Sequence, residues 1–273
     1  MTAVETPDLT AIKSTQQQTW SSGNFSVVAT RIQLVAELLA EHADLRAGWH
    51  VLDVATGSGN AAIAAARSGT SVVGVDYVPA LLDDARVRAA AEGFDIEFLE
   101  GDAEDLPVDT GSFDAVLSVF GSMFAPDHRR AAGEILRAGR PGATIALASW
   151  TPTSFVAEMF RVVTRFVPPP AGLASPMLWG DESHLRELFG AEVEDLRSTE
   201  RVCTWRFPTP EAFVDFFETW YGPTNRGFAR LGEGDRAWMR ASLVDLAREA
   251  DVLRDGGSIA IPATYLETVM RRR

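Results

Sequence analysis

The stretch Val51-Leu-Asp-Val-Ala-Thr-Gly-Ser-Gly-Asn60 decides the fold. Its first four residues form a β-rich run, and the Ala-rich residues 61–68 that follow favour a helix. Gly57 and Gly59 lie between these two elements, where glycine permits positive φ angles and lets backbone amides approach a ligand at the start of the helix. A strand that runs through such a loop into a helix is typical of nucleotide-binding α/β sheets.

The same alternation of strands and helices continues from residue 50 to residue 150. Further strands are expected at 71–75, 96–99, 115–119 and 144–148, and further helices at 79–92 and 128–138. Strands joined by right-handed helical crossovers build a parallel sheet that is covered on both faces. The sequence therefore predicts a doubly wound, mostly parallel, Rossmann-like α/β sheet, with ligands bound beyond the carboxyl ends of its strands.

The remaining segments suggest a cap and a lid around this sheet. An amphipathic helix is expected over 27–39, and aromatic-rich helices over 155–167, 185–189, 210–220 and 235–253. A β-like pair at 193–207 and 259–270 predicts a final antiparallel strand. The expected organisation is an N-terminal helical cap at 1–45, a ligand-binding core at 46–150, and lid helices with the last strands at 151–273, all in one structural domain.

Composition narrows the class of partner. The chain has 38 acidic and 25 basic side chains, so its field repels nucleic acid and favours a small-molecule partner. Cys203 is the one cysteine, which excludes an intrachain disulfide and suits a reducing compartment. No signal-peptide pattern or long apolar run is present, so we expect a cytoplasmic protein without a membrane partner. The oligomeric state stays open, a homodimer included.

The first loop leaves two cofactors open. Residues 57–62 also fit the dinucleotide fingerprint with Ala62 in its third slot, and Asp76 follows the second strand about twenty residues later. A carboxylate at that place can accept hydrogen bonds from two ribose hydroxyls. The pattern therefore suits a nicotinamide cofactor and S-adenosylmethionine (SAM) equally.

The third strand is followed by Glu100-Gly-Asp-Ala-Glu-Asp-Leu-Pro107 and then by Phe113-Asp-Ala-Val116. Here the chain resembles the class I SAM-dependent methyltransferases of the UbiE-like, methyltransferase type 11 group. The resemblance continues through 118–127 and 136–143, so several weak motifs occur in the right order. It implies a SAM-dependent methyltransferase. A nicotinamide-dependent oxidoreductase and a non-catalytic SAM-binding module remain the alternatives.

The resemblance also implies a set of cofactor contacts. In this family the acid of the first loop holds the methionine amino group, the acid after the second strand holds the ribose, and the Gly-Asp-Ala run frames the adenine. The matching acids are Asp53, Asp76 and Asp102, while Ala55 stands where the family commonly has glycine. The cofactor-binding residues expected are Trp20, Phe25, Asp53, Ala55, Thr56, Gly57, Ser58, Gly59, Asp76, Tyr77, Gly101, Asp102, Ala103, Glu104, Ser118, Phe120 and Met123.

The sequence gives less information on the residues that bind the methyl acceptor. Methyl transfer from a sulfonium depends mainly on alignment, so a base is optional. His128 and Tyr221 are the catalytic candidates, although Asp127 and His128 also fit a helix cap and first turn. The substrate residues expected are Met159, Trp179, Trp220, Tyr221 and Asn225. No metal-ligand spacing is present, which favours metal-independent methylation of a small, partly apolar metabolite, preferably at oxygen, with carbon and nitrogen as alternatives.

Overall fold

The computed structural model describes residues 8–170 and 172–273. Within these residues, one seven-stranded sheet has the order β3-β2-β1-β4-β5-β7-β6. The strands are β1 (His50–Val54), β2 (Ser71–Asp76), β3 (Glu97–Glu100), β4 (Phe113–Val119), β5 (Gly139–Trp150), β6 (Val193–Phe207) and β7 (Ile259–Arg272). The first five strands run parallel, and β7 pairs antiparallel with both β5 and β6. The predicted doubly wound, mostly parallel sheet is confirmed.

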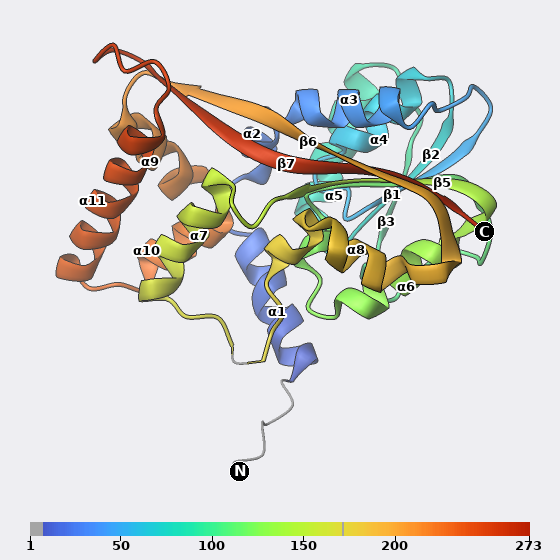
Figure 1. The fold of residues 1–273 in the computed structure, drawn as a ribbon, viewed down its shortest axis with the longest axis horizontal. Coiled ribbons are helices and arrows are strands. Elements are labelled where there is room, and N and C mark those ends of the chain that lie inside the picture. Colours follow the sequence, from blue (N-terminus) through green and yellow to red (C-terminus); the bar gives the residue numbers. More distant parts are fainter. Residues whose placement is uncertain (1–7, 171) are drawn as a thin grey trace.

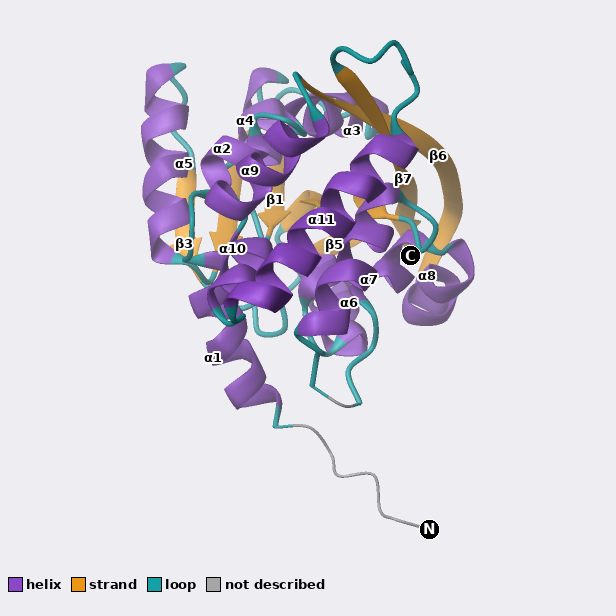
Figure 2. Ribbon diagram, turned by 90° about the vertical axis from the view of Figure 1, so that its left-hand side faces the viewer, coloured by secondary structure: helices purple, strands orange, loops and turns teal. Residues whose placement is uncertain are grey.

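Helices cover both faces of this sheet and one of its ends. They are α1 (Leu9–Trp20), α2 (Phe25–Ala29), α3 (Gln33–His42), α4 (Asn60–Arg67), α5 (Pro79–Ala91), α6 (His128–Ala138), α7 (Phe155–Phe166), α8 (Glu182–Phe189), α9 (Pro210–Trp220), α10 (Gly222–Ala229) and α11 (Glu233–Ala250). Figure 1 shows α3 and α4 on one face of the sheet and α6 and α8 on the other. We call α7, α9, α10 and α11 the lid helices. Figure 2 looks onto them in front of the strands.

The N-terminal region differs from the single helix expected over 27–39. The chain forms α1, then α2, and breaks at 30–32 before α3 begins. The side chains of Val28 before the break, Ile32 within it and Leu39 after it are all buried. The spacing of apolar residues therefore continues across the break, and for this reason the sequence pattern predicted one helix over 27–39. The expected cap includes residues 1–7, which lie outside the described residues.

In the sequence, Gly222 and Pro223 follow the helix expected over 210–220 and predict a mobile loop. This was wrong, because α10 begins there. Proline fits the first turn of a helix, since the amide hydrogen that it lacks would have no partner in the helix. A Cβ atom on Gly222 would lie 2.0 Å from the carbonyl oxygen of Thr19. Glycine at this position therefore lets the end of α1 approach the junction between α9 and α10.

In residues 8–170 and 172–273, no helix combines the length and the apolar character that crossing a membrane would require.

Gly222→Ala should destabilise the protein by about 1–3 kcal/mol, because the new methyl group forces two backbone segments apart. The matched control is Gly227→Ala in the same helix, where a Cβ atom would meet Val163 Cγ1 at 3.4 Å, an ordinary contact. Thermal unfolding of both variants measures the difference. Equal melting temperatures would show that the approach of α1 to the α9–α10 junction contributes nothing to stability.

Candidate active site

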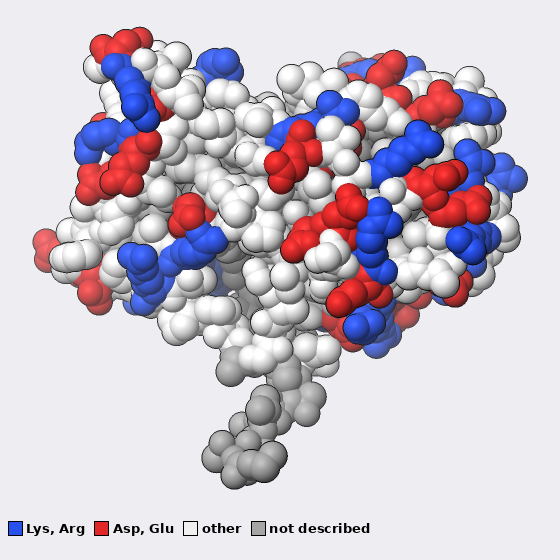
Figure 3. Space-filling model, in the orientation of Figure 1, with Lys and Arg blue, Asp and Glu red and all other residues white. Residues whose placement is uncertain are grey.

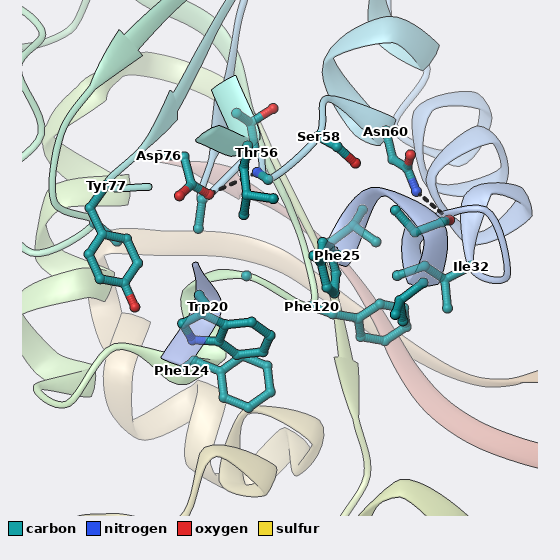
Figure 4. Close-up of a pocket in the computed structure, with 18 of the residues that line it drawn as sticks. Trp20, Phe25, Ile32, Thr56, Ser58, Asn60, Asp76, Tyr77, Phe120 and Phe124 are labelled. Carbon is teal, nitrogen blue, oxygen red and sulfur yellow. Dashed lines mark hydrogen bonds between the residues drawn. The ribbon is translucent and has the colours of Figure 1, made fainter. Parts of the chain in front are cut away.

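A cavity lies at the carboxyl ends of β1, β2 and β4, between the sheet, α1 and the lid helices. We group its lining residues by side-chain chemistry into a polar half and an aromatic half, and the two meet where Asn60 donates a hydrogen bond to the Ala29 carbonyl. The polar half is formed by Lys13, Gln16, Asp53, Ala55, Thr56, Gly57, Ser58, Asn60, Ala61, Asp76, Tyr77, Gly101, Asp102 and Ala103. The aromatic half is formed by Trp20, Phe25, Val28, Ala29, Ile32, Leu81, Val119, Phe120, Gly121, Phe124, Ala125, Pro126, Trp150, Val156, Met159, Trp205, Phe217 and Tyr221. Figure 4 shows Asp76 and Tyr77 on one side of this space and Phe25 and Phe120 on the other.

Two buried carboxylates lie at the ends of neighbouring strands in the polar half. Asp53 Oδ2 accepts hydrogen bonds from Thr56 Oγ1 at 2.6 Å and from the amide of Ala62 at 2.9 Å. Burial raises the pKa of Asp53 to about 7, and the nearby charge of Asp76 adds to this shift. Among the described residues, the hydrogen bonds to Asp53 all fall on Oδ2. Its Oδ1 is therefore available to a cationic or hydrogen-bonding ligand.

Asp76 is held by the first loop itself. Its carboxylate accepts the amide hydrogen of Gly57 at 2.8 Å and that of Val78 at 2.9 Å. Burial raises the pKa of Asp76 to about 6, and the backbone hydrogen bonds oppose this rise. The Gly57 contact ties the loop after β1 to the end of β2, so the two acids share one rigid frame.

The first loop has an unusual backbone at Ala55, the position where the resembling family commonly has glycine. Its φ angle is 54°, in the left-handed region that disfavours side chains. A Cβ atom on Gly121 would lie 2.6 Å from the Ala55 methyl group. Gly121 therefore leaves the room that the Ala55 methyl group occupies, which explains how the loop tolerates alanine.

Helix α1 closes the polar half through Lys13. The Lys13 ammonium lies 2.6 Å from Asp102 Oδ2 and 2.5 Å from Glu104 Oε2. Glu104 is buried and also accepts the amide hydrogen of Asp127 at 2.8 Å. Because an unpaired buried carboxylate is costly, Lys13 both neutralises Glu104 and holds α1 over the loop after β3.

Trp20 at the end of α1 contacts both sides of the cavity. Its ring meets Phe124, Phe25 and Tyr221 edge-on, with centroid distances of 4.9, 5.7 and 5.7 Å. Figure 4 shows Trp20 and Phe124 side by side between the polar and aromatic sides. Deeper in the aromatic half, Phe120 stacks on Trp150 with centroids 3.8 Å apart. Such walls suit an apolar ring and also attract a cation.

The structure brings most of the expected site residues to this cavity. Those that line it are Trp20, Phe25, Asp53, Ala55, Thr56, Gly57, Ser58, Asp76, Tyr77, Gly101, Asp102, Ala103, Phe120, Met159 and Tyr221. The expected residues that are not among the lining residues are Gly59, Glu104, Ser118, Met123, His128, Trp179, Trp220 and Asn225. Ser118 instead joins two elements, since its hydroxyl donates to the Val54 carbonyl at 2.8 Å and accepts from the Ser122 amide at 3.0 Å.

His128 lies in the first turn of α6, away from the cavity lining. Asp127 caps that helix by accepting the amide hydrogen of Arg130 at 3.0 Å. His128 Nδ1 lies 3.0 Å from His184 Nε2, and burial lowers the pKa of His128 to about 4, with the nearby His184 lowering it further. The geometry makes His128 part of the contact between α6 and α8.

Asn225 and Trp220 hold the lid against the N-terminal segment. Asn225 Oδ1 accepts from the Ser22 hydroxyl at 2.6 Å, and its amide donates to the Glu218 carbonyl at 3.0 Å. The Trp220 carbonyl accepts the Asn24 amide hydrogen at 3.0 Å.

Sequence reasoning missed several lining residues, of which Lys13 and Gln16 are the clearest cases. With Trp20 they recur at positions i, i+3 and i+7 of α1, which places them on one helical face. The sequence shows this spacing, but the polar composition of the segment gives no other sign of a ligand-binding face. Trp150, Trp205 and Phe217 were also missed, because each belongs to a strand or helix whose apolar pattern is equally consistent with ordinary core packing.

The residues present fit SAM. The polar half offers buried carboxylates for an ammonium group and for hydroxyls, together with a glycine-containing loop at the start of α4 for a carboxylate. The adjoining aromatic half offers faces that attract a sulfonium and space for an apolar acceptor. Among the residues that the structure describes, no cluster of three or more His, Cys, Asp or Glu side chains could hold a metal ion.

Comparisons with known proteins agree with this fit. Residues 51–142 match the family model of the methyltransferase domain. A Mycobacterium tuberculosis protein named as uncharacterized is 36% identical over 249 residues, which cover 89% of this chain and 91% of the relative. A demethylmenaquinone methyltransferase of Deinococcus radiodurans is 31% identical over 235 residues, covering 78% and 90%. The crystal structure of the YcgJ protein of Bacillus subtilis has a TM-score of 0.61 at 18% identity, over 87% of this chain and 97% of that one.

The similarity to the Deinococcus enzyme extends well beyond the methyltransferase domain and covers most of both chains. The likeness to the YcgJ protein, at 18% identity, shows the shared fold alone. Sheet order, buried acids and sequence similarity agree that the chain belongs to the class I SAM-dependent methyltransferases.

Proposed function

We propose that this enzyme transfers the methyl group of SAM to an oxygen atom of a small, partly apolar metabolite, without a metal ion. The observation that supports this is the continuity of the cavity, which joins a polar half suited to the cofactor to an aromatic half suited to the acceptor. Among the described residues that line the cavity, the charged side chains are Lys13, Asp53, Asp76 and Asp102, and the proposal assigns all four to the cofactor side. An uncharged acceptor therefore suits the remaining walls.

Each half has a distinct task in this proposal. Asp76 accepts the ribose hydroxyls, Asp53 attracts the methionine ammonium group, and Asp102 lies beside the adenine. When bound, SAM supplies a methyl group already activated by its sulfonium. The aromatic side chains exclude water and hold the acceptor oxygen in line with that methyl group, which is the main requirement for this displacement.

The nucleophile needs no base from the chain if it ionises readily. One lone pair of the oxygen forms the new bond to carbon, the carbon–sulfur bond pair remains on sulfur, and the acceptor proton leaves to solvent. A phenolic or enolic hydroxyl meets this condition. The relative named as a demethylmenaquinone methyltransferase supports an aromatic acceptor of the quinol type, with methylation at carbon as the alternative to oxygen.

The proposal also includes the location of the enzyme and its partners. We infer a cytoplasmic enzyme with a small-molecule acceptor rather than nucleic acid, and we leave the oligomeric state open, a homodimer included. Figure 3 supports the exclusion of nucleic acid, because basic and acidic side chains alternate over the visible face. In the same proposal, residues 1–45 cap the cofactor, 46–150 bind it, and 151–273 cover the acceptor.

Calorimetry with S-adenosylhomocysteine (SAH) should show tight binding to the wild type and roughly 10- to 100-fold weaker binding to Asp76→Ala, because hydrogen bonds to an ionised group are lost. The control is Asp83→Ala, which removes an exposed acid of α5. NADH and NADPH are titrated in parallel and should not bind. Binding of NAD(P)H without binding of SAH would contradict the proposed function.

Lowering the pH from 7 to 5.5 should weaken SAH binding by roughly an order of magnitude, because it protonates Asp53, whose pKa in the empty protein is raised to about 7, and much of Asp76, whose pKa is raised to about 6. The ligand ammonium stays protonated throughout this range, so it adds no opposing trend. Asp53→Asn should bind SAH weakly at both pH values. A wild-type affinity that does not change with pH would show that Asp53 does not contact the ammonium group.

A panel of naphthols and hydroxylated quinones incubated with methyl-labelled SAM should yield labelled methyl ethers, with equal yield in millimolar EDTA. Mass spectrometry of the products locates the methyl group. A product labelled at carbon or nitrogen would correct the choice of atom. Loss of turnover in EDTA that magnesium restores would overturn metal independence.

A further inference from the structure

We propose that Tyr221 determines acceptor specificity by donating a hydrogen bond from its hydroxyl to an oxygen of the acceptor. The site then selects apolar rings that carry a carbonyl or ionised oxygen over rings that carry none. This inference rests on the proposed function, since it assumes that the aromatic half receives the acceptor.

The Tyr221 ring is fixed in the wall of the cavity. It is 6% exposed and lies at the junction of α9 and α10. Its ring meets Trp20 and Phe217 edge-on at 5.7 and 5.6 Å. Its backbone forms a bridge with Gly23, and its amide donates to the Phe217 carbonyl at 3.1 Å. The direction of the hydroxyl is therefore set by contacts on several sides.

Among residues 8–170 and 172–273, no hydrogen bond pairs the Tyr221 hydroxyl with another group. Burial alone raises its pKa, and no hydrogen bond counters that rise. In the part of the chain that the structure describes, the polar side-chain atoms that are sealed from solvent and make no hydrogen bond are Trp179 Nε1, Trp205 Nε1 and Arg201 Nε, and the last of these is paired with Glu267 Oε1 at 2.9 Å. The Tyr221 oxygen is not one of them, so it borders the open space of the cavity that its ring lines. When the acceptor displaces water from this space, the hydroxyl loses hydrogen bonding unless an oxygen of the acceptor accepts from it.

Other polar atoms of the aromatic half point to the same kind of ligand. The side chains of Trp20 and Trp150 carry indole N–H groups, which can only donate hydrogen bonds. Trp205 also lines the cavity, but its indole nitrogen is sealed from the space. A wall that offers donors suits a ligand with oxygen lone pairs.

Tyr221 acts in this role as a neutral donor and not as a base. Burial holds the pKa of its phenol above the ordinary value, so the hydroxyl keeps its proton at neutral pH. The hydrogen bond orients the ring so that the neighbouring nucleophilic oxygen faces the methyl group. Losing such a bond to a buried ligand typically weakens binding by roughly tenfold.

The test uses a pair of neutral probes that differ in one oxygen, 1-tetralone and tetralin. Both are titrated into protein saturated with SAH, and binding is followed by tryptophan fluorescence. Wild type should prefer 1-tetralone by roughly tenfold, and Tyr221→Phe should lose that preference with unchanged SAH affinity. The matched control is Tyr265→Phe, which removes the hydroxyl of a buried tyrosine outside the cavity lining and should keep the preference.

Two outcomes would overturn the inference. One is a preference for 1-tetralone that survives in Tyr221→Phe, and the other is failure of both probes to bind SAH-loaded wild type. Failure of SAH itself to bind is a separate result, because it would remove the proposed function. A further readout is the pH profile of turnover, which Tyr221→Phe should leave unchanged because a neutral donor does not titrate in the working range.

Discussion

The burial of two carboxylates at the ends of adjacent parallel strands is the constraint on which the site depends. Asp53 lies opposite Gly74 in the register of β1 and β2, and Asp76 ends β2 two residues later. A Cβ atom on Gly74 would lie 2.7 Å from the Phe98 ring, so glycine at this position leaves room for the Phe98 side chain. Buried acids raise the energy of the empty protein, and a ligand that carries an ammonium group and hydroxyls relieves that cost. The two buried acids therefore favour the binding of a ligand that carries an ammonium group and hydroxyls.

The second half of the site is made by segments that are far apart in the chain. Helix α1 reaches the polar half through Lys13 and the aromatic half through Trp20, and it rests on the junction of α9 and α10. The same helix therefore borders both compartments.

Much of the central sheet could be predicted from the sequence, because strands buried on both faces leave continuous apolar runs and the connecting helices leave glycine or proline at their ends. Asp76 was expected at the site from its place after β2, whereas Asp53 and Asp102 were expected there from the family resemblance. The lid was harder. Gly222 and Pro223 looked like a helix breaker because sequence cannot show that α1 approaches there. The sequence also could not show that His128 contacts His184, 56 positions away, outside the cavity lining. Long-range contacts of this kind decide which apolar side chains line a cavity and which only fill the core.

The most direct test is a crystal structure of the protein with SAH. We expect the ribose hydroxyls on Asp76, the amino group near Asp53, and the sulfur at the boundary beside Trp20, with the aromatic half still open toward Tyr221. A structure in which the adenosyl or methionine part of SAH filled the aromatic half would contradict the assignment of that half to the acceptor.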